Sequence, residues 1–262
     1  MIQYLENMHK INNLKNKLKN GQEVIGTWSS LSSSNVIDVL GTTQLDFVVI
    51  DMEHGSMSFE TVENMVRSAE ASQISPIIRV WDDDEQTILR ALETGVQSIM
   101  IPHIRTADQA EKVAKSCKYY PKGTRGLSPY TRVHNFTHQD LDQSLKDANE
   151  QTLVGILVEG QDGLKNLSEI VTVDGIDLIY LGLFDICQSV GLPGQLLHPN
   201  VVDQIKRCQN LIQSHNIAPG SMSTDVKYIK MLRKFNYKFI AYLNDAAAIK
   251  EHFNEIITSL NS

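Results

Sequence analysis

The 262-residue chain carries a formal net charge of −7, and 42% of its residues are hydrophobic. The negative charge argues against a general nucleic-acid-binding surface. The sequence has no apolar run of about 18 residues, the length that a membrane span needs, and residues 1–6 lack the basic-then-apolar profile of a secretory signal. Three cysteines without metal-ligand spacing predict reduced thiols in a cytoplasmic protein that has no membrane partner.

The N-terminal stretch 5–19 has apolar residues at three- and four-residue spacing among Lys and Asn, from Leu5 to Leu18. This period predicts an amphipathic helix within residues 1–20 that ends near Gly21. We expect the helix to cap the floor of the domain that follows.

Strand-like and helix-like patterns alternate through the rest of the chain. The predicted strands are 23–28, 46–51, 76–80, 97–101, 152–158, 176–181, 217–221 and 239–243. The predicted helices are 35–40, 60–71, 85–93, one that opens on the capping box Thr106-x-x-Gln109, 164–171, 201–214, 226–234 and 246–260. Strict alternation of this kind favours one (β/α)8 TIM barrel over residues 1–262, and a doubly wound open sheet is the alternative.

Polar side chains follow the predicted strands at their carboxyl ends, where a barrel places its active site. They are Trp28, Asp51, Glu53, His54, Arg79, His103, Glu159 and Asp185. Four carboxylates face one arginine and two histidines, and a divalent cation would balance them. Glu159 and Asp185 follow neighbouring strands about 4.8 Å apart, so they form the best pair of metal ligands. Two oxygen donors favour Mg²⁺ or Mn²⁺; the alternative is that each acid independently caps a helix.

The longest irregular segment covers residues 121–150 and contains Gly123-Thr124-Arg125-Gly126 and a polar helix near 138–149. Loops of this length are often functional. The segment lacks the lysine and the length of a phosphate-binding loop.

Several stretches resemble the HpcH/HpaI family of metal-dependent pyruvate aldolases, and they are collinear from about residue 21 to residue 222. They include Gly26-Thr27-Trp28, 46–55 with its Asp-x-Glu-His, Ile78-Arg79-Val80, Met100-Ile101-Pro102, 120–126, Val158-Glu159, Gly182-x-x-Asp185, Ser189-x-Gly191 and His198-Pro199. The resemblance implies a TIM barrel of the phosphoenolpyruvate/pyruvate-binding type. It also implies a homohexamer in which the last helix, within 245–262, packs on a neighbouring subunit.

The resemblance assigns roles to individual positions. It implies that Glu159 and Asp185 bind Mg²⁺ or Mn²⁺ (with Co²⁺ also possible), that His54 is the catalytic base and that Arg79 holds the pyruvate oxygens. Asp51 and Glu53 match the acids behind these groups. Trp28, Gly182, Leu183 and Phe184 are expected to line the substrate site. The implied reaction cleaves or forms a 4-hydroxy-2-oxo acid from pyruvate and an aldehyde.

This chemistry agrees with the residues themselves. A histidine that titrates near pH 6.5 suits the base for the C4 hydroxyl, and no lysine lies at a strand end to form a Schiff base. His54 could instead be a loop residue, Arg79 a salt-bridge partner of Asp51, and His103 an ordinary loop histidine.

Some positions depart from the family pattern. Leu157 and Leu183 stand where glutamine and proline are usual, Tyr120 replaces a proline, and residues 185–188 replace a smaller turn. These differences leave open the aldehyde half and whether the reaction is cleavage, condensation or decarboxylation. Other hypotheses are a carbon–carbon lyase acting on CoA thioesters and a non-catalytic metal-binding barrel.

Overall fold

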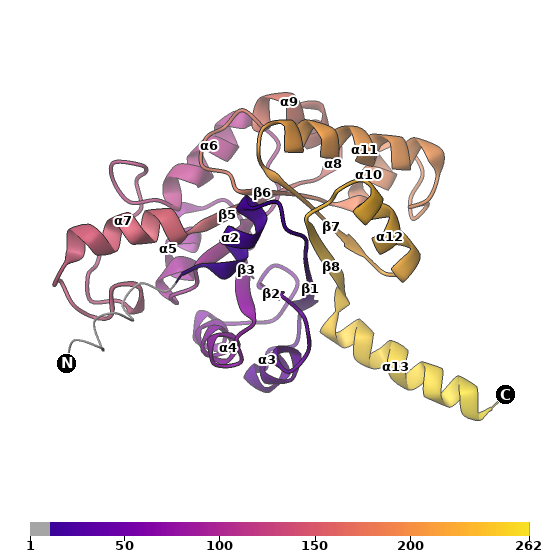
Figure 1. Ribbon diagram of the computed structural model, residues 1–262, viewed down its shortest axis with the longest axis horizontal. Coiled ribbons are helices and arrows are strands. Elements are labelled where there is room, and N and C mark those ends of the chain that lie inside the picture. Colours follow the sequence, from indigo (N-terminus) through magenta and orange to yellow (C-terminus); the bar gives the residue numbers. More distant parts are fainter. Residues whose placement is uncertain (1–10, 262) are drawn as a thin grey trace.

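Eight parallel strands form a closed barrel in the computed structural model, which describes residues 11–261 (Figure 1). They are β1 (Val24–Ser29), β2 (Phe47–Asp51), β3 (Ser75–Arg79), β4 (Ser98–Ile101), β5 (Leu153–Val158), β6 (Leu178–Leu181), β7 (Ala218–Ser223) and β8 (Phe239–Asn244). Val24 of β1 pairs with Phe239 of β8 and closes the sheet. The predicted (β/α)8 barrel is therefore confirmed, and the open sheet is excluded.

Helices follow the strands, and all but the last connect successive strands around the outside of the barrel. They are α3 (Ser34–Gly41), α4 (Phe59–Ala71), α5 (Glu85–Glu93), α6 (Ala107–Ser116), α8 (Gly160–Lys165), α9 (Leu167–Ile170), α10 (Leu183–Ser189), α11 (Pro199–Ser214), α12 (Val226–Lys234) and α13 (Asp245–Leu260). The prediction of one helix over 164–171 is wrong, because two short helices meet at Asn166. The Asn166 side chain donates to Arg105 O over 2.8 Å and ties this break to the neighbouring loop.

Alternation along the strands divides the core into two layers. In β2, Phe47 and Val49 point into the barrel, whereas Val48 and Ile50 pack against the surrounding helices. Asp51 continues the inward series, since alternate residues of a strand share one face. The same spacing relates Arg79 to Ile77 and gives both charged residues an inward position at the carboxyl end of the barrel.

An N-terminal helix, α2 (Asn13–Lys19), closes the opposite end. Leu14 and Leu18 are buried against the inward-facing residues of the barrel, which confirms the predicted capping role. The predicted start at residue 5 falls among residues 1–10, outside the described part of the chain. Residues 11 and 12 are not helical, because Asn12 is the N-cap and its side chain accepts from Lys15 N.

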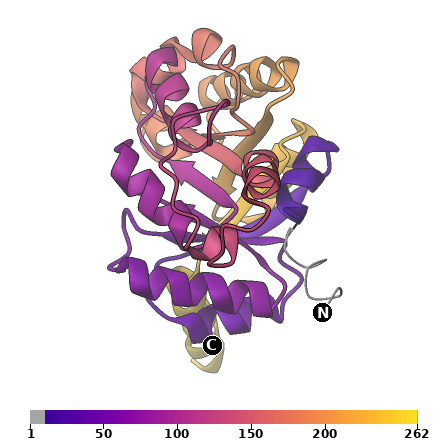
Figure 2. The same ribbon diagram turned by 90° about the vertical axis from the view of Figure 1, so that its left-hand side faces the viewer.

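The C-terminal helix α13 leaves the barrel wall, as Figure 1 shows, and Figure 2 shows the C-terminal end of the chain beyond the barrel. Within α13 only Asp245 is buried. Its carboxylate accepts hydrogen bonds from Ser29 Oγ and from the backbone N–H groups of Ser30 and Leu31, so the start of α13 is tied to the end of β1. No helix among residues 11–261 is long and apolar enough to cross a membrane.

The segment between α6 and β5 contains a 3₁₀ turn (Arg132–His134) and α7 (Leu141–Gln151), which is the polar helix predicted near 138–149. Arg132 bonds to Glu70 at the end of α4 and to Thr94 O just before β4, and Arg125 bonds to Glu93 at the end of α5. Glu70 lies before the amino end of β3, and Glu93 and Thr94 lie before the amino end of β4. The long segment therefore lies at the floor of the barrel rather than beside the strand carboxyl ends.

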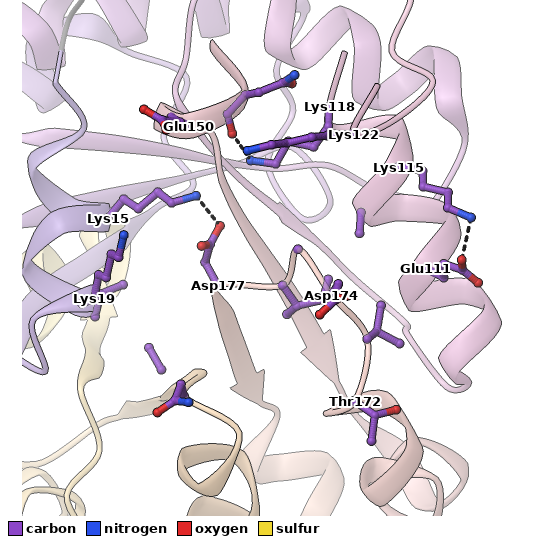
Figure 3. A pocket seen from close by; sticks show the side chains of 18 of the residues that line it. Lys15, Lys19, Glu111, Lys115, Lys118, Lys122, Glu150, Thr172, Asp174 and Asp177 are labelled. Carbon is purple, nitrogen blue, oxygen red and sulfur yellow. Dashed lines mark hydrogen bonds and ion pairs between the residues drawn. The ribbon is translucent and has the colours of Figure 1, made fainter. Parts of the chain in front are cut away.

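A cavity of about 1330 Å³ also opens at the floor (Figure 3). Five lysines and five acids line it: Lys15, Lys19, Lys115, Lys118, Lys122, Asp108, Glu111, Glu150, Asp174 and Asp177. Figure 3 shows Lys15 directed at Asp177, with its Nζ 2.9 Å from the carboxylate. The charges of these ten residues balance, and none of them comes from a strand carboxyl end.

Candidate active site

A buried ion pair joins the carboxyl ends of β2 and β3. Asp51 and Arg79 are register partners, and they are 5% and 8% exposed. Arg79 donates from Nε to Asp51 Oδ1 over 2.9 Å and from Nη2 to Asp51 Oδ2 over 2.6 Å. The salt-bridge alternative for Arg79 is thus what the structure shows. Because this bidentate edge is occupied by Asp51, the Nη1 side of the guanidinium is left to face other groups.

Trp28 forms the wall beside this guanidinium. The Arg79 Cζ atom lies 4.4 Å from the centre of the indole ring, a cation–π distance. Trp28 Nε1 donates to the Tyr180 hydroxyl over 3.2 Å. Burial raises the pKa of Tyr180, so its hydroxyl stays protonated at neutral pH. This contact fixes the indole, which in turn limits the movement of Arg79.

The turn after β2 holds the candidate base. Asp51 Oδ1 accepts from the backbone N–H groups of Glu53 (3.1 Å) and His54 (3.2 Å). Gly55 N bonds to Asp51 O over 3.0 Å, and a Cβ on Gly55 would lie only 2.3 Å from that oxygen. A glycine is therefore required to close the turn. The His54 side chain is exposed and makes no hydrogen bond within the described residues.

Glu53, His103 and Glu159 form a second cluster at the same end of the barrel. Glu53 Oε2 lies 3.0 Å from Arg79 Nη1, and Glu53 Oε1 lies 2.9 Å from His103 Nε2. On its other side, His103 Nδ1 lies 2.6 Å from Glu159 Oε1. A histidine between two carboxylates can donate to both when both ring nitrogens carry protons. His103 thereby connects the carboxyl ends of β2, β4 and β5, and Glu53 extends the connection to Arg79 of β3.

Asp185 lies in the first turn of α10, and its side chain is outside what the structure describes. The capping alternative for Asp185 is wrong, because α10 begins earlier, at Leu183, with Gly182 as its N-cap. The Leu183 side chain is buried in the outer core. Phe184 is 47% exposed.

The donor chemistry at this end of the barrel fits a hard divalent cation. Strands β5 and β6 pair up to Val158 and Leu181, and Glu159 and Asp185 follow these residues. Glu159 is the N-cap residue of α8 but makes no side-chain capping bond, contrary to the capping alternative. No group of three His, Cys, Asp or Glu among the described residues is arranged to hold a metal. Two carboxylates with water and substrate are the ligand set that Mg²⁺ accepts.

The structure brings together five of the expected residues: Trp28, Asp51, Glu53, Arg79 and Glu159. His54 is adjacent in sequence to this group, but no side-chain hydrogen bond from the described part of the chain holds it. His103 was expected from the sequence to be an ordinary loop histidine, and Tyr180 was not among the expected site residues. The sequence signal for a site role of His103 was its position immediately after Ile101-Pro102 at a strand end.

A closed (β/α)8 barrel with buried charged groups at its strand carboxyl ends defines a class of barrel enzymes. The chain belongs to the HpcH/HpaI aldolase/citrate lyase family, whose model matches residues 24–248. Enzymes named as aldolases in this family are carbon–carbon lyases, and this chain is an enzyme of that type.

Relatives and solved structures support this membership. The chain is 30% identical over 239 residues to a hydroxypyruvate/pyruvate aldolase of Roseobacter denitrificans, covering 91% of this chain and 93% of the relative. It is 30% identical to a 4-hydroxy-2-oxo-heptane-1,7-dioate aldolase of Shigella flexneri, covering 88% and 86%. A family protein from Burkholderia cenocepacia superposes with a TM-score of 0.89 at 26% identity, over 96% and 100% of the chains. A citrate synthase superposes with a TM-score of 0.85 at 28% identity, over 95% and 97%.

Proposed function

We propose that the protein is a divalent-metal-dependent aldolase that cleaves or forms 4-hydroxy-2-oxo acids, with pyruvate as one product or substrate. The observation that carries the proposal is the network that runs from the buried pair Asp51 and Arg79 through Glu53 to His103, whose side chain is 50% exposed, and on to Glu159. The network combines the guanidinium of Arg79, which can bind an anion, with acids at the strand carboxyl ends. The chain also belongs to a family of aldolases. The whole of residues 1–262 acts as one barrel domain in this proposal.

The proposed reaction makes two demands on the protein. His54 removes the proton from the C4 hydroxyl during cleavage and returns it during condensation. Its exposed imidazole has room for this substrate contact. Arg79 Nη1 carries two N–H groups, of which one faces Glu53 in this proposal and the other stabilises the enolate oxygen of pyruvate. Asp51 holds the other edge of the guanidinium in place.

Glu159 and Asp185 would hold the cation. When bound, Mg²⁺, Mn²⁺ or Co²⁺ polarises the C2 carbonyl of the 2-oxo acid as a Lewis acid. Trp28 and Phe184 line the proposed substrate site, and Gly182 provides a backbone position between Glu159 and α10. Leu157 is buried inside the barrel and brings an apolar group where the family pattern has an amide.

Pyruvate, Mg²⁺ or Mn²⁺ and a panel of aldehydes test the proposal. The wild type should form new 4-hydroxy-2-oxo acids, detected by mass spectrometry, and Glu159→Gln should form them at least about 10²-fold more slowly. Absence of product with every aldehyde and metal, from protein shown to be folded, contradicts the proposal.

A second candidate is carbon–carbon bond formation with a CoA thioester. The observation that favours it is the 28% identity to a citrate synthase over nearly the whole chain. Incubation with oxaloacetate and acetyl-CoA tests it, because condensation with thioester hydrolysis releases free CoA thiol. The same sample reports decarboxylation, which consumes oxaloacetate and releases carbon dioxide without thiol.

The proposed assembly is a homo-oligomer, with a hexamer as the expected state. The exposed apolar residues of α13 recur at helical spacing along one stripe: Ile249, Phe253, Ile256, Ile257 and Leu260. A stripe of this kind needs a partner surface, and the helix of a second copy offers one. The three buried, unpaired cysteines support action in the reducing cytoplasm.

A further inference from the structure

His103 directs its backbone N–H and both ring nitrogens at two carboxylates. Its backbone N donates to Glu159 Oε1 over 3.1 Å, and its ring Nδ1 lies 2.6 Å from the same oxygen. Its ring Nε2 lies 2.9 Å from Glu53 Oε1. The backbone N–H and both ring nitrogens of His103 therefore each face an acid of the active site.

The backbone of His103 has an unusual conformation that makes this possible. Its φ angle is +60°, in the left-handed region that non-glycine residues rarely adopt. Such a conformation persists where the surroundings hold it on several sides. Here Pro102 precedes the residue, and Ile104 N donates to Leu157 O of β5 over 3.1 Å. The turn thus directs both the backbone N–H and the ring of His103 toward Glu159.

We propose that His103 is a positioning residue for the metal site: it fixes the carboxylate of Glu159 and links it to Glu53 and Arg79. This inference rests on the proposed metal-dependent function. Neighbours that hydrogen-bond to a ligating carboxylate set its orientation, and their loss typically lowers metal affinity about 10–100-fold. Since Glu53 also contacts Arg79 Nη1 at 3.0 Å, His103 sets the position of the cation ligand relative to the guanidinium.

Three substitutions separate the contacts of His103. His103→Gly keeps the left-handed backbone and its N–H but removes the ring. His103→Asn places an amide N–H near the position of Nδ1 and keeps the Glu159 contact, and asparagine also tolerates the left-handed conformation. His103→Gln extends an amide toward the position of Nε2, so its side chain keeps only the Glu53 contact, and the backbone N–H still faces Glu159. His138→Asn, at a loop histidine that contacts Tyr130, is the matched control.

The readout is the binding of Mn²⁺ alone, followed by electron paramagnetic resonance of the free ion, with thermal melting as the test of folding. His103→Gly should weaken Mn²⁺ binding about 10–100-fold. His103→Asn should recover most of this loss, His103→Gln should recover little, and the control should bind as the wild type does. If His103→Gly does not fold, the ranking of Asn over Gln is the deciding result.

Two kinds of failure are distinguishable. In the first kind, Glu159→Gln weakens Mn²⁺ binding, but His103→Gly binds Mn²⁺ as the wild type does, or His103→Asn and His103→Gln both do so equally. The positioning role is then refuted and the metal site remains. If the wild type binds no Mn²⁺, or Glu159→Gln binds it equally well, the proposed metal site itself is refuted, and the role of His103 is refuted with it.

Discussion

Replacement of Arg79 by lysine separates the geometry of the guanidinium from its charge. Arg79 meets Asp51 at 2.9 and 2.6 Å and approaches Glu53 at 3.0 Å, whereas an ammonium is a point charge that cannot span these acids with one planar fork. Because both Arg79 and Asp51 are nearly buried, the lost charged hydrogen bond should lower the free energy of unfolding by about 1.5–3 kcal/mol. Loss of one oriented donor to the enolate should slow turnover about 10²–10³-fold.

Exchange of the pyruvate methyl protons with D₂O, followed by proton NMR, isolates the enolate step, since it needs no aldehyde. Arg79→Lys should reduce both this exchange and aldol cleavage. His54→Ala should reduce cleavage about 10²–10⁴-fold and exchange clearly less, with little change in stability because the imidazole is exposed. Arg67→Lys, at an exposed pair with Glu63 on α4, is the control and should change neither rate.

Two outcomes would refute this reasoning. Equal loss of exchange in Arg79→Lys and His54→Ala would mean that His54 also serves the enolate, and the division of labour would be wrong. Unchanged exchange in Arg79→Lys, with melting that shows a folded protein, would mean that Arg79 does not stabilise the enolate.

The remaining predictions concern the metal, the assembly and the barrel floor. Excess EDTA and Asp185→Asn should each abolish aldol turnover without unfolding the protein, and full activity in EDTA would contradict metal dependence. The Phe253→Glu/Ile256→Glu double variant should shift a light-scattering mass from an oligomer to a monomer, whereas a monomeric wild type at micromolar concentration would refute the assembly. Burial lowers the pKa of Lys118 to about 8, so the unfolded chain binds more protons than the folded protein between about pH 8 and the usual 10.5. The unfolding free energy of the wild type should therefore rise relative to Lys118→Met across this window in denaturant titrations, and a constant difference would refute the shift.

The sequence alone determined the barrel, because strand and helix periods are local properties of the chain. Buried parallel strands are continuous apolar runs, and the predicted spans 85–93 and 226–234 agree with α5 and α12 to the residue. Asp51 and Arg79 were predicted to face one pocket because each ends a strand, and their ion pair was the alternative to a substrate role for Arg79. The boundaries that were wrong, near Asn166 and at Asn12, depend on side-chain contacts with distant segments.

Only the tertiary structure decided how the charged groups pair. The sequence shows His103 as a single histidine after a proline, and nothing local indicates that its backbone turns left-handed or that its ring spans Glu53 and Glu159. The edge of Arg79 that faces Asp51 was likewise set by the register of β2 and β3. The length of segment 121–150 favoured a functional loop, but its contacts with Glu70 and Glu93 hold it at the floor of the barrel. Pairings of this kind join residues far apart in the chain. The strand and helix periods that predict the barrel are local, so they do not predict these pairings.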